Sequence, residues 1–313
     1  MKIRAHREAN TLLNKLRFKS SRDIPSYMMV LPAIIILLLF TYMPMYGIII
    51  AFKDYSPFRG IMASNWVGFK HFNFLADSGF WRVFKNTIVI NAYDILFGFP
   101  IPILLAICLN ELVNKHFKKI VQVVTYLPHF ISWVVVSGIF VTLLNPQFGL
   151  VNSLLGKLFG MEPIYFVANS KYFRSVIVFT TIWKTTGMSA IYYLAALTGI
   201  NPELYESATI DGAGKIIQTI KITLPQLKPI IAVLLLLRIA SLTNIGFDQV
   251  YLFYNPVVYD VGDVISTYVY RRGIMETQYS LTTAISMTQA VINFSLLIIA
   301  NKLSRKFSGW SMW

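Results

Sequence analysis

The sequence predicts an all-α protein whose helices cross a membrane six times. Of its 313 residues, 56% are hydrophobic and 13% are charged, whereas about a quarter of the residues in a soluble domain are usually charged. The mean hydropathy is +0.59, and the apolar residues gather in long runs. Because about 20 consecutive apolar residues span the hydrocarbon as a helix, these runs indicate a bundle of membrane helices joined by short loops.

Six segments have the length and composition of a membrane span. They are Tyr27–Ala51, Asn86–Leu109, Ile120–Leu144, Tyr172–Leu197, Pro229–Phe247 and Leu281–Ala300. The first is too long for the apolar core of a cleaved signal peptide, and no small-residue cleavage site follows it. We therefore expect a cytosolic tail at 1–25, a first helix with an outer loop at 26–85, a five-helix core at 86–303 and a second cytosolic tail at 304–313.

Lysine and arginine set the orientation of these spans. They are enriched in both terminal tails and in the connections after the second and fourth predicted spans. Loops rich in these residues stay in the cytosol, so both termini are expected to be cytosolic. The formal net charge of +14 is then explained by topology and by contact with anionic membrane lipid. No nucleic-acid motif accompanies it, so nucleic acid is not an expected partner.

The connection between the fourth and fifth predicted spans has the pattern of two short helices joined at a corner. Asn201-Pro202 can begin the first helix, with the asparagine as its cap and the proline in its first position. Asp211-Gly212 is expected to end it, because glycine readily adopts the left-handed conformation of a sharp exit. A second helical stretch is expected over residues 214–223. Leu224-Pro225 is expected to end that stretch and return the chain to the membrane.

This connection resembles a known motif. The chain reads Glu206-Ser207-Ala208-x-x-Asp211-Gly212-Ala213, followed by Ile222-x-Leu224-Pro225, which is similar to the EAA loop of binding-protein-dependent ABC importer permeases. In that family the loop is the coupling helix that docks on an ATPase subunit. The resemblance therefore implies a coupling role for Glu206, Ser207, Ala208, Asp211, Gly212, Ala213, Ile222, Leu224 and Pro225. The chain departs from the family pattern at Ser207, where alanine is usual, and at Thr219, where an aromatic is common.

Other segments look like the polysaccharide-type, LplB-like branch of the carbohydrate permeases. They include Trp183-Lys184, Gly246-Phe-Asp-Gln and the Ser-Met-Trp terminus. The resemblance implies a type I ABC importer permease in the bacterial cell membrane, paired with a second, different permease subunit. It also implies two ABC ATPase subunits, an extracytoplasmic solute-binding protein and an oligosaccharide substrate as partners.

Motifs for chemistry within the chain itself are not found. No G-x-x-x-x-G-K-[ST] occurs, so the phosphate cradle of an ATPase is missing. ATP and magnesium are accordingly expected on the partner ATPase subunits, and no cofactor is expected on this chain. The four histidines are scattered and Cys108 is the only cysteine, so neither a metal site nor a catalytic residue is predicted.

Three ionisable residues lie inside predicted spans. Because placing a charged side chain inside a membrane costs free energy, each of them is a functional candidate. They are Asp94, Lys184 and Arg238. One interpretation is that they pair with each other or with carbonyl groups and stabilise the bundle. Another is that they line a substrate path, with Trp183 stacking on a sugar and Lys184 and Thr185 binding its hydroxyl or uronate groups. Two cations against one anion favour an acidic saccharide, and Asn244 is a further candidate at the mouth of the path.

The residues leave two other functions open. The chain could be an ABC permease for another polar solute, or a secondary transporter that uses the three ionisable residues as an ion relay without an ATPase. A secondary transporter predicts internal repeats between the two halves of the chain, and none is evident. A membrane enzyme acting on lipid-linked glycan would need a reactive cluster at one interface, which the sequence lacks. Alternating access driven by partner ATPases is the preferred mechanism.

Overall fold

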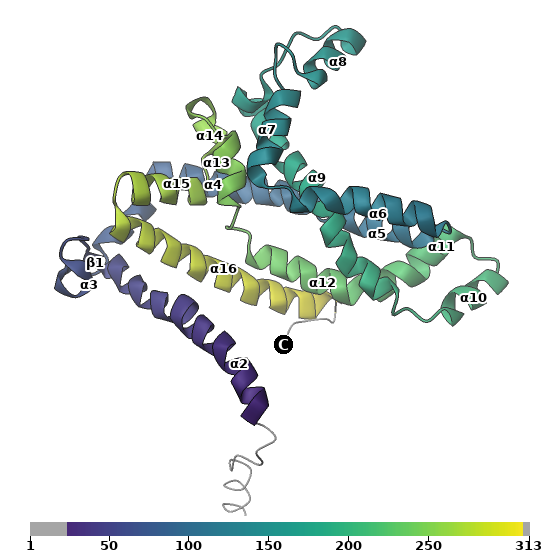
Figure 1. Ribbon diagram of the computed structural model, residues 1–313, viewed down its shortest axis with the longest axis horizontal. Coiled ribbons are helices and arrows are strands. Elements are labelled where there is room, and N and C mark those ends of the chain that lie inside the picture. Colours follow the sequence, from purple (N-terminus) through teal and green to yellow (C-terminus); the bar gives the residue numbers. More distant parts are fainter. Residues whose placement is uncertain (1–23, 309–313) are drawn as a thin grey trace, which may run out of the picture. The chain divides into compact units, whose positions relative to one another are not determined.

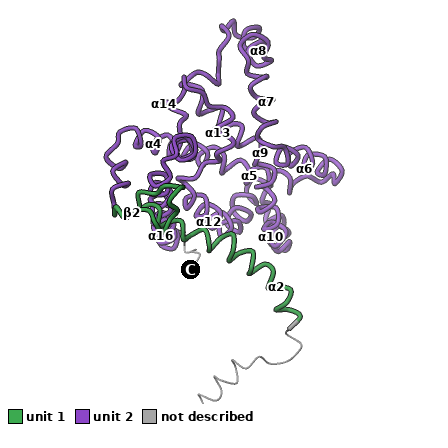
Figure 2. The backbone as a smooth tube through the Cα atoms, turned by 60° about the vertical axis from the view of Figure 1, so that its left-hand side comes forward, with its two compact units in different colours: residues 1–68 green, residues 69–313 purple. Residues whose placement is uncertain are grey.

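The structure, a computed structural model, describes residues 24–308 and is helical almost throughout. Within those residues, the strands are β1 (Lys53–Asp54) and β2 (Asn65–Trp66), which form one antiparallel pair. The prediction of an all-α fold is therefore confirmed. The chain divides into two compact units, residues 1–68 and 69–313 (Figure 2).

The first unit contains one long apolar helix and a small hairpin. The helix runs over Pro25–Phe52 and is long and apolar enough to cross a membrane, as predicted for the first span. It consists of α2 (Ile24–Leu37), a π-helical turn η1 (Leu38–Tyr42) and η2 (Met43–Phe52). The short helix α3 (Gly60–Ala63) separates β1 from β2, and the rings of Phe52 and Trp66 stack with centroids 5.7 Å apart.

The second unit contains three further apolar helices of spanning length, Ser78–Glu111, Lys215–Ala240 and Tyr279–Lys306 (Figure 1). The first two each contain a π-helical turn near a proline. Their parts are α4 (Ser78–Tyr93), η4 (Asp94–Gly98) and α5 (Pro100–Glu111), then α11 (Lys215–Gln218), η6 (Thr219–Thr223) and α12 (Leu224–Ala240). The third lies in α16 (Tyr279–Ser308).

The predicted third span is broken. It folds as α6 (Lys115–Phe130) and α7 (Trp133–Leu143), which meet at an angle of 104°. The predicted span Ile120–Leu144 is therefore not one continuous helix, because Ser132 adopts an extended conformation and caps α7, accepting a bond from the amide of Val135.

The predicted fifth span ends early. Its helix stops at Ala240, and residues 241–246 form a turn before α13 (Phe247–Phe253) begins. Side chains from other helices satisfy the carbonyl groups of this turn: the amide of Asn91 donates to Leu242 and that of Gln289 to Thr243, at 2.8 and 2.6 Å. The partners that replace helical hydrogen bonds here lie far away in the sequence.

Helix α9 (Ser170–Leu197) matches the fourth predicted span and packs against α5, α6 and α12. Its close approach to α6 requires glycine, since a Cβ on Gly187 would lie 2.0 Å from the carbonyl oxygen of Thr125. Among residues 24–308, however, only four helices are both long and apolar enough to span, or five if α6 and α7 form one span. The count of six spans is therefore not confirmed.

Shorter elements complete the second unit. They are η3 (Lys70–Ala76), α8 (Leu150–Phe159), η5 (Phe166–Ala168), α10 (Glu203–Ile210), η7 (Pro256–Val258), α14 (Tyr259–Gly262), α15 (Ile265–Tyr270) and η8 (Arg271–Met275). Helix α10 extends away from the bundle beside the start of α11, whereas α7 and α8 project together elsewhere (Figure 1).

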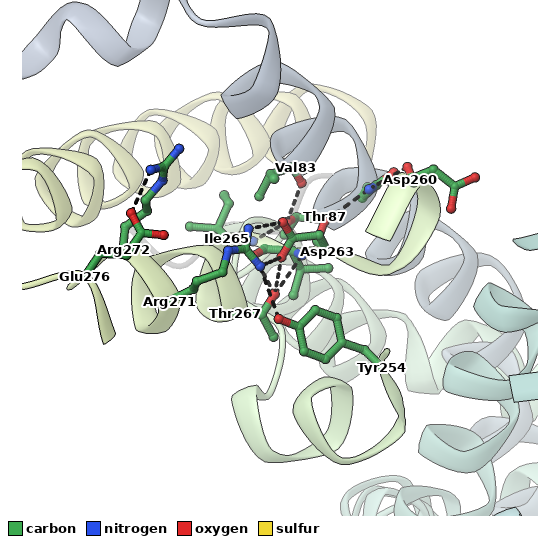
Figure 3. Close-up of polar contacts among 12 residues, drawn as sticks. Val83, Thr87, Tyr254, Asp260, Asp263, Ile265, Thr267, Arg271, Arg272 and Glu276 are labelled. Atoms are coloured by element: carbon green, nitrogen blue, oxygen red, sulfur yellow. Dashed lines mark hydrogen bonds and ion pairs between the residues drawn. The ribbon is translucent and has the colours of Figure 1, made fainter. Parts of the chain in front are cut away.

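A buried ion pair joins the elements between α12 and α16. Asp263, whose side chain is 1% exposed, accepts a hydrogen bond of 2.5 Å from Arg271, which also donates to the hydroxyl of Tyr254 (Figure 3). Burial alone would lower the pKa of Arg271, but the hydrogen bonds and charge of Asp263 outweigh it, and the pKa is raised. Thr87 of α4 accepts a bond from the amide of Ile265, so the network fixes α15 to the start of a spanning helix.

Candidate functional site

The corner predicted after α10 is present. The Oδ1 atom of Asn201 accepts a hydrogen bond of 3.1 Å from the first amide of the helix. At the other end, Gly212 has a φ angle of +78°. Its amide donates to the carbonyl of Thr209, and the amide of Ala213 donates to that of Ala208 at 2.8 Å. This pair of bonds is a Schellman motif, and the prediction that Asp211-Gly212 ends the helix is confirmed.

The helix after the corner does not end where predicted. It continues from Lys215 to Ala240 as one spanning helix, so the prediction that Leu224-Pro225 stops it was wrong. A proline interrupts a helix because it has no amide hydrogen and its ring clashes with the preceding turn. Here the wide π-helical turn Thr219–Thr223 precedes it, and Pro225 lies in the first turn of α12. Ile222 belongs to that wide turn.

Two sets of side-chain contacts that were not predicted hold the corner together. Gln218 is buried and donates to the hydroxyl of Thr209 and to the carbonyl of Ala213, both at 2.9 Å. The hydroxyls of Tyr205 and Thr223 lie 3.0 Å apart. The available signal was a glutamine placed directly after Ile216 and Ile217. These contacts fix the angle between α10 and the spanning helix that follows.

The outer surface of α10 combines acidic and apolar groups. Glu206, Ser207 and Asp211 are exposed, and within the described part of the chain neither carboxylate forms an ion pair. Ile210 is 87% exposed and Leu204 is 42% exposed. Exposed apolar side chains bordered by polar residues are typical of a surface that contacts another protein.

A second link shows which end of the bundle carries α10. The ammonium of Lys215 lies 3.0 Å from a carboxylate oxygen of Glu111, the last residue of α5. Both side chains are substantially exposed, so the pair adds little stability. It does place the corner beside the connection at 112–114, for which the sequence predicts the cytosolic side.

Two cavities lie in the middle of the second unit. The larger, of about 310 Å³, is lined by one face of α9 and by parts of η4, α5, α6 and α12. The smaller, of about 90 Å³, lies between η4 and the turn after α12. Asp94, Thr181 and Arg238 line both, so these three residues form the boundary between the cavities.

Asp94 and Arg238 form an ion pair at this boundary. The Asp94 side chain is 8% exposed, whereas that of Arg238 is 44% exposed. The π-helical turn contributes space for the carboxylate, since a Cβ on Gly98 would lie 2.7 Å from its Oδ1 atom. The sequence left open whether these residues pair with each other or line a substrate path. For Asp94 and Arg238, pairing with each other is confirmed.

Lys184 has a different environment. Its ammonium donates to the carbonyl oxygens of Pro128, His129 and Ile131 at 3.2, 2.7 and 2.5 Å. It thus satisfies the carbonyl groups freed by the break between α6 and α7. An ammonium has three donors, and all three have acceptors here. Lys184 lines neither cavity.

The remaining path candidates are divided among these environments. Thr185 lines the larger cavity and Asn244 lines the smaller. Trp183 lines neither and packs edge-on against Phe140, with centroids 5.4 Å apart. The structure therefore brings together four of the six candidates and leaves Trp183 and Lys184 outside.

Two buried side-chain amides that line the smaller cavity were not predicted from the sequence. Asn91 donates to the turn after α12, and Gln249 donates to the carbonyl of Ile177 and the hydroxyl of Thr181, at 2.8 and 2.5 Å. Both are buried, and amides within apolar runs were the signal. Broken helices with polar partners at mid-bundle are typical of transporter binding sites.

Comparisons with known proteins agree with this geometry. The family model described as "Binding-protein-dependent transport system inner membrane component" matches residues 98–309. The chain is 45% identical to the polygalacturonan/rhamnogalacturonan transport system permease protein YteP of Bacillus subtilis (strain 168), over 90% of this chain and 88% of that protein. It is 42% identical to protein LplB of the same strain, over 91% of this chain and 90% of that protein.

A solved structure is also similar along most of its length. It is a bacterial alginate ABC transporter in complex with an alginate pentasaccharide-bound periplasmic protein. One of its chains matches with 42% identity and a TM-score of 0.84, over 93% of this chain and 97% of that chain. A second crystal structure, of a bacterial ABC transporter that imports the acidic polysaccharide alginate, matches with a TM-score of 0.83, 42% identity, and coverage of 91% of this chain and 96% of that chain.

Proposed function

The chain belongs to the family of binding-protein-dependent transport system inner membrane components, and on that premise we propose that it carries acidic oligosaccharides across a bacterial inner membrane. It is a multi-pass permease of an ABC importer for sugars or polysaccharides. In the proposal, separate ATPase subunits bind ATP and magnesium and act on this chain through α10. The chain itself contributes no covalent chemistry.

One observation carries the proposal: α10 is a short projecting helix whose angle is fixed. The Schellman motif at Gly212 and the bonds from Gln218 set that angle, and the exposed tip combines carboxylates with Ile210. An element that must transmit force to a partner has to be stiff and has to offer a contact surface. This arrangement supports the coupling role implied by the EAA-like residues.

The helix after the corner supplies a physical connection to the cavities. It contains 26 residues from Lys215 to Ala240, which corresponds to about 39 Å at 1.5 Å per residue. Arg238 lies near its far end and lines both cavities. A displacement of α10 by an ATPase subunit would therefore move the boundary between the cavities, as alternating access requires.

The substrate and the partners follow from the relatives. One relative is a permease for polygalacturonan and rhamnogalacturonan, and the similar solved importer takes alginate, an acidic polysaccharide. We extend an acidic oligosaccharide substrate to this chain, delivered by a solute-binding protein on the outer side. A second, different permease subunit and cytosolic termini complete the proposed complex.

The proposal is tested by copurification and reconstitution. The tagged chain should retain a Walker-type ATPase and a second permease subunit during purification. In proteoliposomes with the binding protein, uptake of a uronate oligosaccharide should require ATP, and Gly212→Pro should abolish it. Uptake that proceeds without any ATPase would contradict the proposal and would favour a secondary transporter.

A further inference from the structure

Arg238 has more hydrogen-bond donors than the protein uses. A guanidinium carries five N–H donors and keeps its charge in proteins. Within residues 24–308, its side chain forms one hydrogen bond, from Nη2 to the Oδ2 atom of Asp94. Nearly half of its surface is exposed, and it lines the larger cavity. Donor groups on its remaining edge are therefore available to a molecule in that cavity.

Asp94 holds this guanidinium in place. The carboxylate is almost fully buried, and the missing side chain at Gly98 leaves room for its Oδ1 atom. Arg238 is its ion-pair partner among the described residues. Because one edge of the guanidinium is tied to a buried anion, the orientation of the other edge is restricted.

The free edge of an arginine matches one ligand group especially well. Two parallel N–H groups bind both oxygens of a carboxylate, and such charge-assisted bonds are roughly twice as strong as neutral ones. The same cavity is lined by Thr185, Ser189 and Tyr192, residue types that can bind sugar hydroxyls and pack on a sugar face. Lys184 cannot serve in this way, because its three donors are already bound to carbonyl oxygens.

We propose that Arg238 binds the carboxylate of a uronate residue inside the larger cavity and that Asp94 is its positioning residue. This inference rests on the proposed function, since it assigns the recognition of an acidic sugar to one site in the transport path. It replaces the hypothesis that Lys184 binds the uronate.

The experiment uses the complete importer in proteoliposomes, with its ATPase subunits and binding protein. Uptake of a uronate oligosaccharide is compared with uptake of the same oligosaccharide after its carboxyl groups have been reduced to alcohols. Each rate is divided by that of the unaltered importer, so that selectivity of the binding protein cancels. The variants are Arg238→Gln, Arg238→Lys, Asp94→Asn, the double variant of Asp94→Asn with Arg238→Gln, and Lys184→Met as a control cation.

Recognition predicts a loss that is specific for the acidic sugar. Arg238→Gln should reduce its uptake below saturation by roughly 10- to 100-fold, the range expected for a lost charged hydrogen bond, with much less change for the reduced sugar. Arg238→Lys should restore part of the loss. Asp94→Asn should raise the half-saturating concentration of the acidic sugar only. Lys184→Met should change both sugars by the same factor.

The double variant separates recognition from a structural tie. It leaves no unpaired charge in the bundle, so a purely structural pair predicts that uptake of the acidic sugar recovers, whereas recognition predicts that it stays low. Equal losses for both sugars in Arg238→Gln, together with recovery in the double variant, would overturn the inference. If the unaltered importer moved neither sugar with ATP, the proposed function would fail instead.

Discussion

Replacing Gly212 by alanine tests the corner without adding a steric clash. The φ angle at this position is +78°, and a Cβ built there meets no atom within 4 Å. The substitution therefore acts through the backbone alone. Holding an L-residue other than glycine in the left-handed region costs about 1–2 kcal/mol, which corresponds to a factor of roughly 5–30 in a local equilibrium.

Amide hydrogen exchange measures that equilibrium directly. The amides of Gly212 and Ala213 are protected by the Schellman bonds, so their exchange should be about 5–30 times faster in Gly212→Ala, in line with the loss of local opening free energy. Gly214 provides a matched control: its φ angle is −69° and its Cβ position is also open. Gly214→Ala should leave protection nearly unchanged, and Gly212→Asn should lie between the two because asparagine tolerates this conformation.

A corner that matters for coupling should also affect the importer as a whole. In reconstituted complexes, Gly212→Ala should lower substrate-stimulated ATP hydrolysis more than Gly214→Ala does. Equal exchange protection in the two alanine variants would refute the reasoning about backbone strain. If amide exchange were faster in Gly212→Ala but substrate-stimulated ATP hydrolysis were unchanged, the reasoning about backbone strain would hold and the coupling role of the corner would be contradicted.

Three further predictions concern stability, measured as the thermal unfolding of purified protein in detergent. Gly187→Ala should destabilise the folded protein by about 1–3 kcal/mol or more, because the new Cβ would press against the backbone of α6. Gly138→Ala is the control: a Cβ at that position meets no atom within 4 Å and should have little effect on stability. Arg271→Gln leaves a buried carboxylate unpaired and should cost about 3–5 kcal/mol, whereas Arg272→Gln breaks a partly exposed pair and should cost less than about 1 kcal/mol. Gln218→Leu should destabilise the protein by about 1–3 kcal/mol, because the Ala213 carbonyl and the Thr209 hydroxyl would lose the donor that Gln218 provides. If the variant were as stable as the unaltered protein, the corner would not depend on this side chain.

Features set by neighbouring residues could be predicted from the sequence. The left-handed Gly212 follows from local rules and is found. Asn201 accepts a bond from the first amide of α10, as such rules also suggest, although the cap position itself is taken by Pro202. The all-α class and the first span follow equally from the composition of continuous segments. These predictions needed no knowledge of what packs against what.

Features that depend on distant partners could not be predicted. The sequence shows Lys184 in an apolar run, but its acceptors are carbonyl groups more than 50 positions away, which become available only because α6 breaks. The pairing of Asp94 with Arg238 joins residues 144 positions apart. The early end of the fifth span likewise depends on amides from α4 and α16.

The π-helical turn at Thr219–Thr223 has a geometric consequence for everything beyond it. Such a turn holds one residue more than a turn of α-helix, so every residue beyond it faces about 100° away from its direction in an uninterrupted α-helix of the same sequence. The direction in which Arg238 faces is therefore determined some fifteen residues earlier, beside the corner. If the turn closed to α-helical geometry with all its residues retained, Arg238 would face about 100° away from Asp94, although neither residue had been altered. The width of this turn therefore determines whether the ion pair can form.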